Sequence, residues 1–171
     1  LQDRATRDQH LQQAIAQTRE SSLSEMAEGV HLRAARWALD DREPAASLQW
    51  LQELPQGAAR RTLALRLKLK AARMAGRIPD ALETARLLVK HKAFTPTAAR
   101  VLVRGLLIER IGQAHDLDQL RRTWTGLEPS ERALPEVAVQ AARRLVELGG
   151  QAEEAGPWLL PAWLSFVESP G

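Results

Sequence analysis

The chain has 171 residues, a formal net charge of +3 and no cysteine. The lack of cysteine excludes disulfide frameworks, thiolate metal sites and cysteine nucleophiles, and so small a net charge gives no indication of nucleic-acid binding. No apolar run reaches the roughly 18 residues of a membrane span. Tyrosine is absent and phenylalanine occurs twice, while alanine and leucine dominate, so we expect an all-α protein long enough to bury a sizeable core.

Helix-favouring segments alternate with short breaks along the whole chain. Ser22 and Glu25 have the spacing of a capping box, which predicts that a second helix begins near residue 24, after a first helix has ended near residue 19. The expected helices are 4–19, 24–39, 44–54, 59–75, 79–92, 96–111, 116–127, 135–148 and 152–166.

Proline and glycine mark where these helices are expected to begin and end. Thr95 is a good N-cap, because it precedes a proline that suits the first turn of a helix. Glycine is favoured just past a helix C-terminus, where the backbone often turns left-handed. The first-turn prolines are Pro44, Pro79 and Pro96, and the glycines expected just past helix ends are Gly76, Gly112 and Gly149.

The breaks recur about every 35 to 38 residues. The segments DREPAASL (41–48) and GRIPDALE (76–83) align at Arg, Pro and Ala with a shift of 35 residues. A period of 34 residues or slightly more, with two helices in each period, is typical of a helical repeat array. We therefore expect residues 1–171 to form a single helical-repeat domain of about four helix pairs, with degenerate first and last repeats.

Residues 60–77, RRTLALRLKLKAARMAGR, are ambiguous between a strand and a helix. Leucines at alternate positions from 63 to 69 are typical of a strand with one solvated face, but helix formers take over at KAARMAGR, so we favour a helix. Two apolar faces then lie nearly opposite each other, as on a helix packed on both sides. One face holds Leu63, Leu67, Ala71 and Met74, and the other holds Leu65, Leu69 and Ala72.

A basic stripe runs between these two faces at spacings of i, i+4, i+7 and i+11. Such a stripe focuses anionic partners, and arginine binds carboxylates in a bidentate way, so we predict that it binds a partner on the concave surface. The plainer interpretation is a solvated face, or pairing with acids such as Glu83 or Glu109. The stripe consists of Arg66, Lys70, Arg73 and Arg77.

The histidines and tryptophans have plainer interpretations as well. We expect surface or capping roles for the four histidines, since none has convincing metal-ligand spacing; they are His10, His31, His91 and His115. Core packing is expected for Trp37, Trp50 and Trp124. Trp158 and Trp163 lie in a C-terminal apolar segment that could cap the helix stack, mediate dimerisation or touch a membrane surface.

No catalytic constellation is present in the sequence. It contains no Gly-rich phosphate loop, no GxSxG and no HExxH motif, and nothing in the spacing groups the Ser, His and Asp residues. We therefore predict a non-enzymatic protein with neither catalytic residues nor a metal site.

Six segments together resemble the HemY family, bacterial inner-membrane proteins with tetratricopeptide-like repeats. The resemblance covers residues from about 8 to 155. The segments are RDQHLQQA (7–14), AARWALDD (34–41), GAARRTLALRLKLKAARMAGR (57–77), DALETARLLVKHKAF (80–94), DLDQLRRTWTGL (116–127) and PEVAVQAARRLVELG (135–149).

The resemblance implies a tetratricopeptide-like right-handed solenoid of antiparallel helix pairs. It also implies that the chain, which begins without Met, is a fragment of a longer protein anchored by two preceding transmembrane helices. The repeat domain would lie on the cytoplasmic side of the bacterial inner membrane, and the family is associated with haem and porphyrin biosynthesis but has no defined reaction.

The expected function is thus a protein-interaction scaffold whose partners include haem-pathway enzymes but no nucleic acid, and which holds no resident cofactor. One alternative is direct binding of haem or another tetrapyrrole, with arginines holding the propionates. The other is a structural spacer or oligomerisation domain.

Overall fold

The computed structural model describes residues 2–168, in which ten helices and no strand occur. The predicted all-α class is therefore confirmed for this part of the chain. The chain divides into two compact units, the first ending at Ala75 and the second beginning at Gly76.

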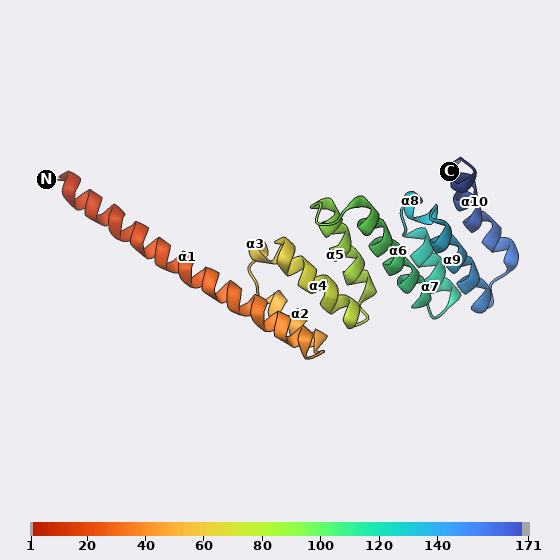
Figure 1. The fold of residues 1–171 in the computed structure, drawn as a ribbon, viewed down its shortest axis with the longest axis horizontal. Coiled ribbons are helices and arrows are strands. Elements are labelled where there is room, and N and C mark those ends of the chain that lie inside the picture. The colour runs from red at the N-terminus through yellow and green to blue at the C-terminus, as the bar shows by residue number, and fades with distance from the viewer. Residues whose placement is uncertain (1, 169–171) are drawn as a thin grey trace. The chain divides into compact units, whose positions relative to one another are not determined.

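The first unit is built around one long helix. The helices of this unit are α1 (Gln2–Asp40), α2 (Pro44–Gln52), α3 (Gln56–Ala59) and α4 (Thr62–Met74). In Figure 1, α1 extends well beyond α2, α3 and α4, which lie around its C-terminal end. Between residues 3 and 30 only Glu28 is even half-buried, so the core of this unit depends on the last quarter of α1.

The expected break between residues 19 and 24 is wrong, because α1 passes through it as continuous helix. An N-cap needs non-helical backbone angles, and the serines of this segment stay helical. The physical reason is that neither glycine nor proline occurs there, and a few serines cost a helix only some tenths of a kcal/mol each. Ser22 and Glu25 are consequently exposed side chains in the interior of α1.

Small and branched apolar residues join α1, α2 and α4. One buried cluster consists of Ala35, Leu51, Leu54, Ala58 and Ala64, and a second consists of Leu39, Leu48 and Ala71. The buried hydroxyl of Ser47 on α2 donates a hydrogen bond of 2.8 Å to the backbone carbonyl of Ala35 on α1. This bond fixes α2 against α1, since both are also in extensive contact.

Residues 62–74 form helix α4, as the helix interpretation of this stretch predicts. The face with Leu65, Leu69 and Ala72 is buried. The second apolar face is only partly covered: Ala71 is buried, whereas Leu63 is 52% and Met74 37% exposed.

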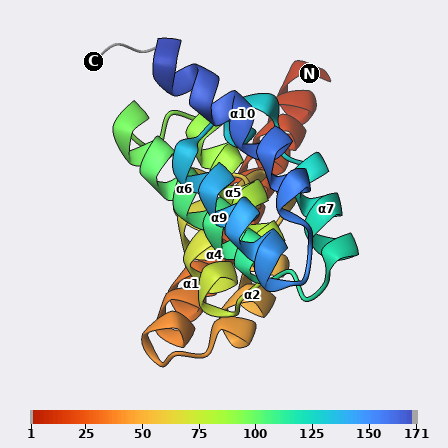
Figure 2. The same cartoon turned by 90° about the vertical axis from the view of Figure 1, so that its right-hand side faces the viewer.

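The second unit contains six helices. They are α5 (Ile78–Lys90), α6 (Pro96–Gly112), α7 (Leu117–Thr125), α8 (Pro129–Arg132), α9 (Pro135–Glu147) and α10 (Ala152–Glu168). Helix α6 packs between α5 and α9, and α10 packs on α9 (Figure 2). The shorter α7 contacts α6 and α9, and α8 contacts α9 and α10. The largest fully buried side chains of this unit include Leu88, Leu106, Leu107, Ile111, Leu120 and Leu145.

Most predicted helix boundaries agree with the structure. Pro44, Pro79 and Pro96 lie in first turns, and the Thr95 hydroxyl accepts a hydrogen bond of 3.2 Å from the backbone N–H of Ala98. Gly76 and Gly149 follow helix ends with φ of 74° and 91°, values that favour glycine. Gly112 differs, because it is the last residue of α6 and Gln113 is the C-cap.

The tryptophans are less buried than expected. Trp124 is 6% exposed and belongs to the core, but Trp37 is 61% and Trp50 39% exposed, so the prediction of core packing is wrong for these two. Trp50 is partly covered by the ring of His31 on α1, whereas Trp37 lies on an exposed face of α1. Trp158 stacks on Trp124 with ring centroids 5.0 Å apart, whereas Trp163 is 61% exposed.

Candidate protein-binding groove

A shallow groove of about 240 Å³ lies between α1 and α4 of the first unit. Its lining residues are Gly29, Leu32, Arg33, Arg36, Leu63 and Leu67. Leu32 and Leu67 also pack against the buried cluster around Ala35, so they form a floor that is fixed by the core. The groove is therefore a feature of packed helices rather than of a loop.

Local sequence explains why the groove stays open. Gly29 has no side chain, and a Cβ placed there would meet no atom within 4 Å. On α4, Leu63 and Leu67 are four residues apart and so lie on one helix face. The ion pair between Arg61 and Glu28, with 3.2 Å between Nη1 and Oε2, connects the start of α4 to α1 close to this face.

Basic side chains flank the apolar floor. Arg33 and Arg36 belong to the lining on α1. Lys70 follows Leu63 by seven and Leu67 by three residues, so it shares their face of α4, and it is exposed. No acidic residue lines the groove, so its rim attracts anionic groups.

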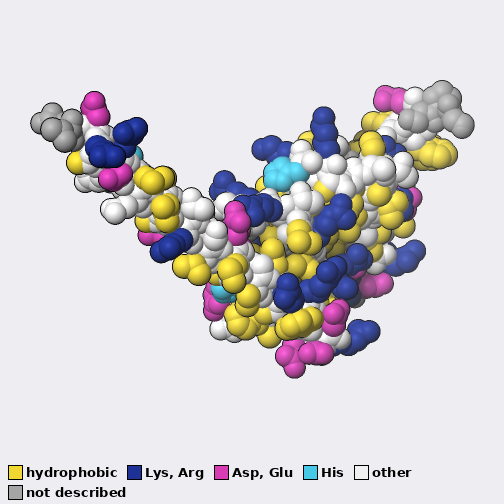
Figure 3. Space-filling view, turned by 60° about the vertical axis from the view of Figure 1, so that its left-hand side comes forward, with side chains coloured by type: hydrophobic (Ala, Val, Ile, Leu, Met, Phe, Trp, Pro, Cys, Tyr) yellow, Lys and Arg dark blue, Asp and Glu magenta, His cyan; other side chains and the backbone are white. Residues whose placement is uncertain are grey.

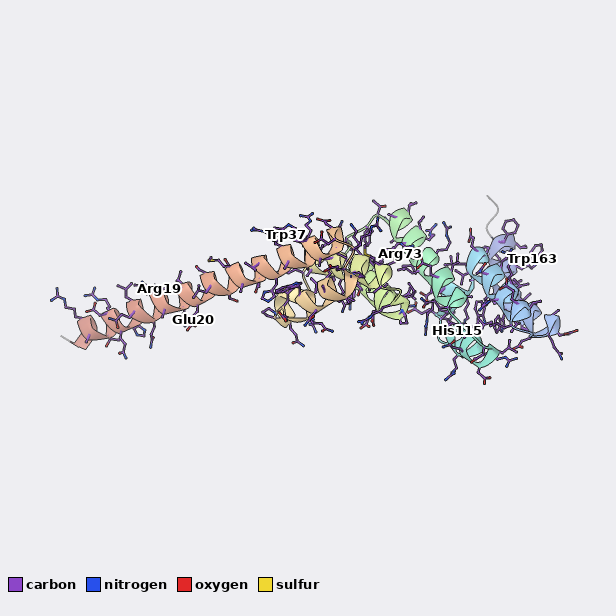
Figure 4. The ribbon with its side chains drawn as sticks, turned by 90° about the horizontal axis from the view of Figure 1, so that it is seen from below. Arg19, Glu20, Trp37, Arg73, His115 and Trp163 are labelled. Atoms are coloured by element: carbon purple, nitrogen blue, oxygen red, sulfur yellow. The ribbon has the colours of Figure 1, made fainter. Side chains whose placement is uncertain are left out.

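The predicted basic stripe is present over three of its four positions. Arg66, Lys70 and Arg73 are exposed on α4, with Arg66 and Arg73 about 40° and 60° further around the helix than Lys70. Figure 4 labels Arg73 near the C-terminal end of α4.

Arg77 does not continue the stripe, which corrects the prediction. Helix α4 ends at Met74, and Gly76 adopts a left-handed backbone with φ 74°. Arg77 is instead the N-cap residue of α5 in the second unit. Arg77 is eleven residues after Arg66, but helix α4 ends at Met74, so the helical spacing does not extend to Arg77.

Sequence reasoning missed the contribution of α1 to the groove. Arg33 and Arg36 are three residues apart and follow Gly29 and Leu32 on the same helix face, a pattern that could have indicated a basic edge beside an open position. It was missed because Trp37, four residues after Arg33, was expected to lie in the core, whereas its side chain is 61% exposed.

Three of the four histidines are exposed, and His31 is half-buried. The Nδ1 atom of His31 lies 2.6 Å from the Ala27 carbonyl oxygen, and its Nε2 atom lies 3.2 Å from Glu53 Oε2. Its ring also packs edge-on against Trp50, with centroids 5.5 Å apart. His91 is the C-cap of α5, and His10 and His115 are exposed. Among residues 2–168, no three His, Asp or Glu side chains gather in a way that could hold a metal ion.

The second unit contains a bidentate ion pair between α7 and α10. Arg121 Nε and Nη2 donate to the two carboxylate oxygens of Glu154, at 2.7 and 3.0 Å. This bidentate pair lowers the pKa of Glu154 through the hydrogen bonds from Arg121 and raises that of Arg121. The pair joins α7 to α10, which indicates a structural role.

Comparison with protein-family models, curated proteins and solved structures finds no match to this chain, so membership of the HemY family stays an expectation of the sequence. Across the described residues, no helix combines the length and the apolar character needed to cross a bilayer.

Proposed function

We propose that this protein is a non-catalytic interaction scaffold, and that the groove between α1 and α4 binds an acidic, partly apolar segment of a partner protein. The observation that carries the proposal is an apolar lining of Leu32, Leu63 and Leu67 beside the cations of Arg33 and Arg36. Lys70 adds an exposed cation on the same face of α4 as the two α4 leucines. An amphipathic helix with acidic residues beside its apolar face complements this arrangement.

The two kinds of contact would contribute differently to binding. Burial of partner side chains on the leucines supplies most of the affinity, at about 25 cal/mol per Å² of apolar surface before the costs of association. The arginines and Lys70 raise the association rate and select against basic partners. Binding should therefore weaken with salt, mainly through the association rate.

The size of the groove favours a peptide over a tetrapyrrole. Its volume of about 240 Å³ lies below the roughly 300–1,000 Å³ of sites that enclose drug-sized ligands. It accommodates a few side chains rather than a macrocycle. Direct haem binding in this groove is thus the less supported alternative.

The resemblance to HemY supplies the proposed setting. In that setting the chain forms a tetratricopeptide-like right-handed solenoid of antiparallel helix pairs beside the bacterial inner membrane, anchored through further segments, and assembles enzymes of haem and porphyrin biosynthesis. Repeated helix-favouring segments with a period near 35 residues support this proposal.

The test is fluorescence polarisation with a labelled helical peptide that carries leucines at i, i+3, i+4 and i+7 and glutamates elsewhere. A matched peptide has lysine in place of each glutamate. We expect the acidic peptide alone to bind, and the variant Arg36→Glu/Lys70→Glu to weaken its binding at least tenfold. Lys68→Glu is the matched control, because Lys68 is exposed on α4 about 160° around the helix from Lys70.

Equal binding of both peptides, or unchanged binding by the double variant, would contradict the groove as the site. A haemin titration separates the alternative: a saturable one-to-one Soret shift, weakened in Arg66→Glu/Arg73→Glu, would establish tetrapyrrole binding instead.

A further inference from the structure

A second surface, which shares only Arg33 with the groove, runs along the outer side of α1. We define the outer stripe as ten positions that share one helix face, all of them exposed: Arg4, Asp8, Leu11, Ile15, Arg19, Ser22, Met26, Val30, Arg33 and Trp37. At 100° per residue this face points about 150° away from the core residues Ala35 and Leu39. Figure 4 accordingly shows Arg19 and Trp37 on the same side of α1, and Glu20 on the other.

The apolar members of the outer stripe are large and strongly exposed. Leu11, Met26, Val30 and Trp37 are 60–67% exposed and Ile15 is 46% exposed. Figure 3 shows hydrophobic and charged side chains alternating along this helix. So many large apolar side chains on one face of a helix indicate a partner surface.

The spacing between successive positions of the outer stripe is the same when counted from either end. Its successive spacings are 4, 3, 4, 4, 3, 4, 4, 3 and 4 residues, which are symmetric about the point between residues 20 and 21. A second copy of α1, laid antiparallel so that paired residue numbers sum to 41, therefore places every stripe position opposite another stripe position. The mean spacing, about 3.7 residues, is close to the helical 3.6, so the two helices stay in contact without strong supercoiling.

The residue types match across this register. Leu11 meets Val30 of the second copy, and Ile15 meets Met26, and by two-fold symmetry each pair occurs twice. Asp8 meets Arg33, which is an opposite-charge pair. Arg4 meets Trp37, where the guanidinium can lie over the indole ring.

Charge also selects the direction of pairing. In a parallel, in-register pair each position meets its own copy, so Arg4, Arg19 and Arg33 would each face a like charge, and so would Asp8. Like charges at contact positions are destabilising. In the antiparallel register Asp8 meets Arg33, Arg4 meets Trp37 and Arg19 meets Ser22, so no charged position lies directly opposite a like charge.

We propose that two copies of this chain associate through the outer stripes of α1 in this antiparallel register. The interface extends from residue 4 to residue 37, about 50 Å of helix. In each copy α2 and α4 pack on the core side of α1 near its C-terminal end, and Met26, Val30 and Trp37 stay exposed there. The second helix can therefore approach without displacing the core.

Cysteine pairing tests the register, because the native chain contains no cysteine. When Leu11→Cys and Val30→Cys chains are mixed and oxidised, we expect a disulfide-linked dimer that joins one chain of each type. Neither variant alone should crosslink, since residues 11 and 11 of two copies would be about 28 Å apart along the axis and a disulfide needs Cα atoms within about 7 Å. Crosslinking of each variant with itself, with no disulfide-linked dimer that joins one chain of each type in the mixture, would establish a parallel pair and overturn the proposal.

Sedimentation equilibrium gives the second readout. The native chain should have twice the chain mass at micromolar concentration. Asp8→Arg alone and Arg33→Asp alone should each raise the dimer dissociation constant at least tenfold, and the combination should restore it, because the pair is re-formed with reversed polarity. A native chain that is monomeric throughout, or a double variant weaker than both single variants, would overturn the proposal. Circular dichroism verifies that each variant keeps its helix, and the peptide assay with Arg36→Glu separates any failure here from failure of the groove.

Discussion

Arg86 on α5 binds Glu131 on α8 through a single nitrogen, Nη2, which lies 2.9 Å from both carboxylate oxygens. Glu131 is only 7% exposed, and its Oε1 also accepts a hydrogen bond of 2.9 Å from the backbone N–H of Glu128. One buried carboxylate thus caps the short helix α8 and ties it to α5. The pair lies within the second unit. The negative charge of Glu131 is compensated by the Arg86 guanidinium and by the Glu128 N–H.

We expect Glu131→Ala to lower the free energy of unfolding by about 2 kcal/mol, because the Glu128 N–H and the Arg86 guanidinium both lose their acceptor. Glu131→Gln should cost less, since its amide oxygen can still accept from Glu128. Urea denaturation followed by circular dichroism measures both. Arg100→Ala, at an exposed position of α6, is the control and should change the free energy by less than about 0.5 kcal/mol.

The coupling of the pair is tested by Arg86→Ala/Glu131→Ala. Its loss should be smaller than the sum of the two single losses, because removal of both partners leaves no buried charge unpaired. Additive losses would show that the two side chains contribute independently.

Ser47→Ala should lower the free energy of unfolding by about 1 kcal/mol. The substitution removes the hydroxyl that donates to the Ala35 carbonyl across the contact of α2 with α1. Ser47 is fully buried, so no water replaces this donor and the hydrogen bond is lost. Ser24→Ala, exposed in the interior of α1, is the matched control. Equal stability of the native chain and Ser47→Ala would show that the bond makes no net contribution.

The Arg121–Glu154 pair should make stability depend on acid pH. The folded-state pKa of Glu154 lies below its ordinary value because Arg121 donates to the carboxylate. A lowered carboxyl pKa stabilises the fold above the unfolded-state pKa, and this contribution is lost as pH falls through the lowered value. Glu154→Gln should therefore be less stable than the native chain at pH 7, and the difference should shrink as the pH falls below about 5. A difference that stays constant down to pH 2 would contradict this assignment.

Trp158→Ala should loosen α10 from the second unit. The indole of Trp158 stacks on the buried Trp124 at 5.0 Å, so truncation removes aromatic packing and uncovers part of the core, at a cost of about 2 kcal/mol. Trp163→Ala is the matched control on the same helix, because Trp163 is 61% exposed. If Trp163→Ala proves as destabilising as Trp158→Ala, the stack is not the main attachment.

Local chemistry was sufficient to predict most helices and their boundaries. Thr95 before Pro96 caps α6, and Gly76 and Gly149 end helices in left-handed conformations, because these preferences depend on backbone geometry within a few residues. The helix at 62–74 followed from the same kind of argument. The break near Ser22 failed for a related reason: a capping pattern is an opportunity for a helix to begin, and nothing local forced the preceding helix to end.

The sequence by itself determined the all-α class, the positions of most helices and the presence of cations at 66, 70 and 73, because propensity and periodicity are properties of neighbouring residues. The short helices α3 and α8 were not predicted. Only the tertiary structure decided which side chains meet across the chain. It brought Arg33 and Arg36 beside Leu63, excluded Arg77, exposed Trp37 while burying Trp124, and paired Arg86 with Glu131. Each of these depends on which faces of separate helices pack together, and the burial of apolar surface between distant segments sets that choice.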